Sequence, residues 1–250
     1  MNASGQTTML PDTFDPAGLH TLQVIAKADQ FNKWMYETIR PYLKGEILEI
    51  GSGIGNISKF VISNRLSLTL SDYNTEYQQF LKENFSEFTN VQAILSIDLQ
   101  HPDFFNHYFA LKEKYDSVFL LNVIEHLEDD IVAIENCRFL LKKGGRLVIL
   151  APAYPFLFCR FDKELGHYRR YSQKKLSFFF PHNSFKILHT QYFNFIGIAG
   201  WFIFGKLLKR KMIRSGEMSA FNKMVPFFKL ADLITFKKAG LSVIAIAEKK

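Results

Sequence analysis

The chain has 250 residues, of which 48% are hydrophobic and 22% charged, values typical of one large or two small globular domains. A core of that size needs no metal or disulfide, so disordered, collagen-like and disulfide-scaffold classes are excluded. Two cysteines indicate a reducing compartment, and we expect a cytoplasmic protein. Charge is uneven: residues 1–150 carry a net −6 and residues 151–250 a net +13. The basic part is compatible with an anionic partner or a merely solubilising face.

Strands and helices alternate through the first part of the chain, after a polar segment at residues 1–20 that predicts a loose arm. Helices are expected over 28–43, 56–64, 75–88, 102–114 and 127–143, the last ended by Gly144 and Gly145. Strands are expected over 46–50, 66–71, 91–97, 117–121 and 146–150. This alternation predicts a parallel sheet with helices on both faces and ligands beyond the carboxyl ends of its strands.

The second part departs from that rhythm. Its elements, in order, are expected to be a loop-rich stretch over 151–171, a short helix capped by Ser172, a strand over 185–193, a helix over 221–238 and a strand over 241–247. Residues 195–214 are apolar first and basic afterwards, and the apolar run is too short to span a bilayer. Such a segment fits peripheral contact with an anionic membrane, a cover over the active site or a dimer face.

The most informative motif is a glycine-rich turn after the first strand. Glu49 is followed by Gly51, Gly53 and Gly55, and then by a predicted helix. Glycines allow a tight turn and close approach of a ligand to the backbone, and the helix start offers free N–H groups. A dinucleotide fingerprint requires a glycine where this chain has Asn56, so that fingerprint fails.

With three further motifs in order, the sequence resembles the class I S-adenosylmethionine-dependent methyltransferases, closest to the small-molecule branch that includes quinone-biosynthesis enzymes. The further motifs are Asp72-Tyr73, Asn122-Val-Ile-Glu-His-Leu127 and Lys143-Gly-Gly-Arg-Leu-Val-Ile149. The resemblance implies one domain with a Rossmann-like, doubly wound seven-stranded sheet, mostly parallel with an antiparallel last strand. Residues 28–150 would be the cofactor-binding core, 151–240 an acceptor-side loop and helical insert, and 241–250 the last strand.

The same resemblance implies S-adenosylmethionine as cofactor and assigns residues to it. The glycine turn, with Glu49 and Ser52, would wrap the methionine part of the cofactor. The backbone near Asn122 would contact the same part. Asp72 would accept hydrogen bonds from the ribose hydroxyls. Tyr73 would pack on the adenine, and Asp98 with Leu99 would lie at the adenine edge.

Methyl transfer from a sulfonium needs mainly orientation, with a general base only where the acceptor must lose a proton. His126 and His167 are the candidate bases, because histidine titrates near neutral pH, although each could equally be structural. Some relatives bind a divalent ion through Glu-x-x-Glu-His. Here Asn122 replaces the first glutamate, so we expect no metal.

The acceptor is expected to be a small molecule or lipid-like and anionic. Trp34 on the first helix is one candidate contact. Arg169, Arg170 and Tyr171, in the stretch Gly-His-Tyr-Arg-Arg-Tyr, are the others, because Arg forks match carboxylate and phosphate; a solvated basic loop is the alternative. Oligomeric state is left open.

Two rival functions are a nucleic-acid methyltransferase and a non-enzymatic S-adenosylmethionine-binding module. The basic C-terminal part suggests the first, but the segment after the fourth strand has neither the prolines of base amino-methylation nor a cysteine nucleophile. The intact glycines and Asp72 argue against the second.

Overall fold

The computed structural model describes residues 16–210, 212 and 215–250. One seven-stranded sheet has the order β3-β2-β1-β4-β5-β7-β6. The strands are β1 (Ile47–Ile50), β2 (Leu68–Ser71), β3 (Val91–Leu95), β4 (Tyr115–Leu121), β5 (Leu141–Pro152), β6 (Phe185–Phe193) and β7 (Ser242–Lys249). Neighbouring strands from β1 to β5 pair in parallel, whereas β7 is antiparallel to both β5 and β6. The predicted Rossmann-like sheet is therefore confirmed.

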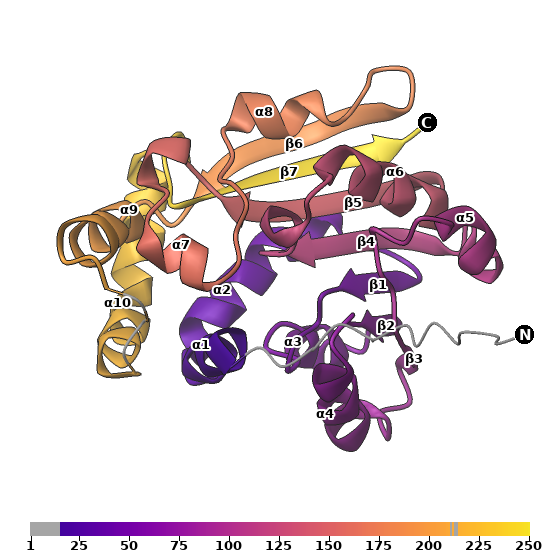
Figure 1. The fold of residues 1–250 in the computed structure, drawn as a ribbon, viewed down its shortest axis with the longest axis horizontal. Helices are drawn as coiled ribbons and strands as arrows, with labels where there is room; N and C mark the ends of the chain where they lie inside the picture. The colour runs from indigo at the N-terminus through magenta and orange to yellow at the C-terminus, as the bar shows by residue number, and fades with distance from the viewer. Residues whose placement is uncertain (1–15, 211, 213–214) are drawn as a thin grey trace, which may run out of the picture.

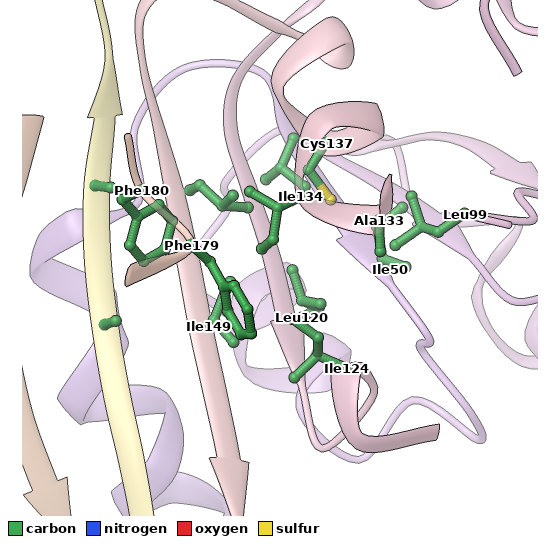
Figure 2. Packing of buried hydrophobic residues seen from close by; sticks show 14 of the residues in the cluster. Ile50, Leu99, Leu120, Ile124, Ala133, Ile134, Cys137, Ile149, Phe179 and Phe180 are labelled. Carbon is green, nitrogen blue, oxygen red and sulfur yellow. The ribbon is translucent and has the colours of Figure 1, made fainter. Parts of the chain in front are cut away.

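Helices cover both faces of the sheet because the central strands are apolar on both sides. On β4, Phe119 belongs to the hydrophobic cluster beneath α2, α3 and α10, whereas Leu120 belongs to the cluster beneath α5, α6 and α8. Figure 2 shows Ile134 and Cys137 of α6 on the side where Leu120 and Ile149 lie. The helices are α1 (Pro16–Ala26), α2 (Asp29–Ile39), α3 (Ser58–Ser63), α4 (Thr75–Phe85), α5 (Phe104–His107), α6 (Asp130–Leu140), α7 (Arg160–Glu164), α8 (Gln173–Phe178), α9 (Gly197–Trp201) and α10 (Ser215–Ile234).

The helical insert between the last two strands lies at the end of the sheet where the parallel strands finish. Figure 1 shows α7, α9 and α10 gathered at the end to which β1, β4 and β5 point. A π-helix, η5 (Phe202–Leu207), continues α9, and α10 packs on α2. The expected helical insert is thus present.

Two local expectations were wrong. Residues 16–20 were assigned to a loose arm but begin α1; residues 1–15 lie outside the described part. The helix over 127–143 ends at Leu140 instead of at the glycines, and Gly144 sits inside β5 with a positive φ of 74°. Buried Leu141 already pairs with Tyr115, and the ladder shifts register before Ser117, so sheet pairing overrides the glycine stop signal.

The other helix boundaries shift by a few residues. The helix expected over 102–114 is only α5 followed by a 3-10 turn at Phe109–Leu111. The helix expected over 221–238 begins earlier, at Ser215.

Candidate active site

The glycine turn follows β1 at the carboxyl end of the sheet. Gly51, Gly53 and Gly55 have φ of 69°, 54° and 81°, a region that side chains rarely adopt. A Cβ on Gly51 would lie 2.4 Å from Val123, and one on Gly55 would lie 2.3 Å from Phe85. The turn therefore requires glycine for its backbone and for its close neighbours.

Asp72 ties this turn to the end of β2. Its Oδ2 accepts the Gly53 N–H at 2.8 Å, and its Oδ1 accepts the Asn74 N–H at 2.9 Å. The side chain is buried, which raises the pKa of its carboxyl, while these backbone hydrogen bonds act in the opposite direction. Tyr73, directly after it, is half exposed.

Glu49 lies beneath the turn. Its carboxyl accepts a hydrogen bond from the Ser58 hydroxyl. Burial raises the pKa of Glu49 to about 8, and hydrogen bonds from Ser58 and Ser52 partly oppose that shift. The acid is therefore mostly neutral at pH 7 and supports the turn as a hydrogen-bonded buried group.

These residues line a cavity of about 890 Å³. It extends from the ends of β1, β2 and β4 to the helices of the insert. Every cofactor-binding residue expected from the sequence lines it except Gly55: the lining includes Glu49, Gly51, Ser52, Gly53, Asp72, Tyr73, Asp98, Leu99 and Asn122. The fold thus brings three of the four sequence motifs, together with Asp98 and Leu99, into one cavity, while their roles toward a cofactor stay predictions.

A second polar group lines the same cavity beyond β4. Glu125 and His126 belong to a 3-10 turn, η3 (Ile124–His126), and His167 comes from the loop after α7. The two imidazole rings lie edge to face with centroids 4.6 Å apart. The Tyr168 N–H donates to the Glu125 carbonyl oxygen at 2.8 Å, which holds this loop against the turn.

Asp162, a fully buried residue of α7, fixes one side of this group. Its Oδ1 lies 3.0 Å from His167 Nδ1 and accepts from Arg170 Nε at 2.7 Å. These partners hold the pKa of the Asp162 carboxyl below its usual range despite burial. With Nδ1 bound to a carboxylate, Nε2 is the His167 nitrogen left for an acceptor. The arrangement resembles the carboxylate–histidine pair that orients a general base.

Burial gives the neighbouring groups unusual protonation. It raises the pKa of Glu125 to about 8, and neither carboxyl oxygen accepts a hydrogen bond from another described residue. Burial, together with His167, lowers the pKa of His126 to about 4. At pH 7 the cavity wall therefore presents a mostly neutral carboxylic acid beside a neutral imidazole.

Three of the expected acceptor contacts lie outside the cavity lining. Trp34 is buried in the core, with its ring 4.3 Å from that of Phe193. Arg169 donates to Asp130 at 2.9 Å, and the buried Tyr171 hydroxyl donates to the same carboxylate at 3.1 Å. Each of these side chains has partners within the protein, and its contact with an acceptor stays a prediction.

Arg170 does line the cavity, but its charge already has a partner. It is buried against Asp162, donates to the Ala153 carbonyl at 3.1 Å and lies over the Trp201 ring. Removing this guanidinium would leave the buried Asp162 carboxylate without its arginine partner. The structure therefore gives no free arginine in this stretch for an anionic acceptor.

Sequence reasoning missed Asp162 and the parts of the apolar wall that come from α1 and α10, whereas the apolar run with Trp201 and Phe204 was expected as one possible cover over the active site. Asp162 stands five residues before His167, and that spacing within one loop was a usable signal. The wall comes from α1 and from the insert: Leu22, Ile25, Trp201, Phe204, Met218 and Phe221 line it. No local pattern marks Leu22, Ile25, Met218 or Phe221, because the shared surface arises only when α1, η5 and α10 pack together.

Glu125, His126 and His167 are also a group that could hold a metal ion. One potential ligand atom from each lies within 4.8 Å of the others. Asp162 and the Leu165 backbone hold the two imidazoles, as outer partners of metal-bound histidines do. The expected absence of metal rested on Asn122 in place of the first glutamate and on the lack of metal-site spacing among the other histidines. It stays a prediction.

Comparison with known proteins gives three findings. A family model described as "Methyltransferase domain" matches residues 48–147. The polyketide synthase component of lovastatin nonaketide synthase from Aspergillus terreus is 28% identical over 113 residues, 44% of this chain and 4% of that protein. A ubiquinone biosynthesis O-methyltransferase from Haemophilus ducreyi is 28% identical over 107 residues, 42% of this chain and 44% of that protein.

Among solved structures, a SAM-dependent methyltransferase from Archaeoglobus fulgidus superposes with a TM-score of 0.54 at 18% identity, covering 87% of this chain and 94% of that one. This similarity shows the fold. The chain spans less than half the length of the curated relatives described above.

Proposed function

The chain belongs to the class I S-adenosylmethionine-dependent methyltransferases, and on that premise we propose that it methylates a small, lipid-like acceptor. The single observation that carries the acceptor class is the cavity: one hollow joins the motif residues to a wall of apolar side chains from the insert. A cavity of about 890 Å³ is large enough for the cofactor with part of an acceptor.

The residues around the glycine turn fit S-adenosylmethionine. We assign the Asp72 carboxylate to the ribose hydroxyls, because each oxygen keeps a lone pair beyond the backbone N–H that it accepts. The positive-φ glycines leave no side chain between backbone and ligand. When bound, S-adenosylmethionine supplies an activated methyl group and leaves as S-adenosylhomocysteine.

His167 is the proposed proton acceptor. His167 Nε2 would take the acceptor's proton while the bound cofactor would supply its methyl group to the accepting atom. Asp162 orients the ring and stabilises the imidazolium that results. Glu125, mostly neutral at pH 7, can donate its O–H to the acceptor. His126, kept neutral by burial, serves as a weaker alternative base.

The neutral character of this wall favours an apolar acceptor with a hydroxyl or amine over one recognised by its charge. The anionic acceptor of the sequence hypothesis loses its main support, since Arg169 and Arg170 are paired internally. The ubiquinone biosynthesis O-methyltransferase similarity supports a lipid-like hydroxyl acceptor.

Methyl-transfer assays with prenylated lipids test the proposal. We expect turnover with wild type and a loss of about 100-fold or more in kcat for His167→Gln, the usual scale of a lost general base. His189→Gln is the matched control, because His189 does not line the cavity. Turnover that is equal in the two variants would assign His167 to structure instead of proton transfer.

A further inference from the structure

The outward side of α10 is apolar although the helix already buries its other side. Its inner residues, Val225, Phe228 and Asp232, face the core. Its outer residues, Phe227, Leu230 and Ile234, repeat at helical spacing and are all more than half exposed. When a helix is apolar on both sides and only one side is buried, the exposed side marks an interaction surface.

Other exposed apolar side chains gather close by in the fold. Phe202 and Leu207 are exposed on η5, and Phe236 follows the end of α10 at 80% exposure. More than half of the exposed large apolar residues of the described chain lie between 196 and 236. Figure 1 places α9 and α10 together at one end of the molecule. We call the outward residues Phe227, Leu230, Ile234 and Phe236 the α10 face.

The charges around this face have one sign. Lys209, Lys223 and Lys238 are exposed within residues 202–238 of the described chain. The two acidic residues described there already have partners. Glu217 pairs with Arg210, and buried Asp232 accepts hydrogen bonds from the backbone N–H groups of Asn194 and Phe195. Among the described residues, this segment therefore presents exposed cationic side chains and no exposed acidic ones.

The face also adjoins the acceptor end of the cavity. Met218 and Phe221, on the inner side of α10, line the cavity, as do Trp201 and Phe204 of the preceding helices. One short set of helices thus has a cavity on one side and an exposed apolar surface on the other. If these helices bind a surface that holds a lipid-like acceptor, the acceptor lies close to the entrance of the cavity.

We propose that the α10 face docks on an anionic lipid bilayer, with its apolar side chains among the acyl chains and the lysines at the phosphates. Apolar area with flanking lysines is the pattern of interfacial helices, and each lysine adds attraction to anionic lipid. Every helix in the described part of the chain is too short or too polar to span a bilayer. The docking itself does not depend on the proposed function; only its role in delivering a lipid-like acceptor rests on that function.

Co-sedimentation with vesicles tests the docking. Wild type should pellet with phosphatidylcholine vesicles that contain phosphatidylglycerol, and less with phosphatidylcholine alone. The double variant Phe227→Ser/Phe236→Ser should bind about tenfold or more weakly, since two exposed rings lose their apolar burial. Phe109→Ser/Phe178→Ser is the matched control, because those phenylalanines are 66% and 78% exposed in segments away from α10. Equal binding by the two double variants would overturn the proposal.

The lysines supply a second readout. Lys223→Gln and Lys238→Gln should each weaken binding to the anionic vesicles about fivefold while binding to neutral vesicles stays unchanged. Absence of wild-type pelleting, or a concentration-dependent dimer abolished by the Phe227→Ser/Phe236→Ser change, would contradict docking and assign the face to another occupant. S-adenosylhomocysteine binding, measured on the same variants, separates this outcome from failure of the methyltransferase proposal: docking can fail while cofactor binding remains.

Discussion

The two halves of the chain contribute to one cavity in different ways. In residues 16–150, the polar site residues lie at strand ends, in the glycine turn and in the η3 turn, so the sheet places them, whereas Leu22 and Ile25 of α1 add to the apolar wall. In residues 151–250, they come from a loop and an insert that pack across those strand ends. The first half carries short motifs that reveal its site, whereas the second half builds its wall by packing. A charged loop of the second half, which looked like a binding element, is held by internal ion pairs.

The largest expected effect is a loss of folding stability when the buried ion pair in the second half of the chain is removed. Asp162→Ala leaves buried Arg170 without its carboxylate, and loss of one partner of a buried ion pair costs about 3–5 kcal/mol of unfolding free energy. Urea denaturation measures the loss. Glu164→Ala is the control, because Glu164 forms an exposed pair with Arg160 that should contribute under about 1 kcal/mol. Similar losses for both variants would show that the loop is not anchored through Asp162.

The next effect concerns the first half. Asp72→Ala should weaken S-adenosylhomocysteine binding by about 1–3 kcal/mol, the scale of a lost charge-assisted hydrogen bond. Calorimetry measures the affinity, and Asp103→Ala, outside the cavity lining, serves as the control. Unchanged affinity in the Asp72 variant would refute the ribose assignment.

A smaller effect is expected from the ionisation of Glu125 as pH rises. The folded-state pKa of Glu125 is about 8, above its unfolded value, so its protonation favours folding below the unfolded pKa, and that contribution is lost as pH rises through about 8. Glu125→Gln cannot ionise. We therefore expect the melting temperature of Glu125→Gln to rise relative to that of wild type as pH increases from 5 to 8. A difference independent of pH would mean that Glu125 does not titrate there.

The smallest expected effect is at Arg169. Because its guanidinium is bound to Asp130 and the Glu128 carbonyl, Arg169→Ala should leave KM for the acceptor within about twofold of wild type. A steady-state assay with the acceptor found by screening measures it. A tenfold rise in KM would show that Arg169 contacts the acceptor, as the sequence predicts.

Sequence reasoning predicted the first half well for a physical reason. Strand periodicity, the Gly51–Gly55 turn and Asp72 are local, and parallel strand ends must meet at one edge of a sheet. It failed at Gly144, where sheet pairing by Leu141 overrode a local stop signal. It did not predict that Arg169, Arg170 and Tyr171 bind partners within the protein, because a dense run of polar groups does not reveal where their partners lie. Asp162 and Asp130 supplied those partners only after folding.

Calorimetric titration of the wild-type protein with S-adenosylhomocysteine, with NADH as the control, tests the central claim most directly. We expect saturable binding of S-adenosylhomocysteine and none of NADH, because the cavity joins Asp72 to a glycine turn that lacks the dinucleotide fingerprint. Binding of NADH without binding of S-adenosylhomocysteine would contradict it.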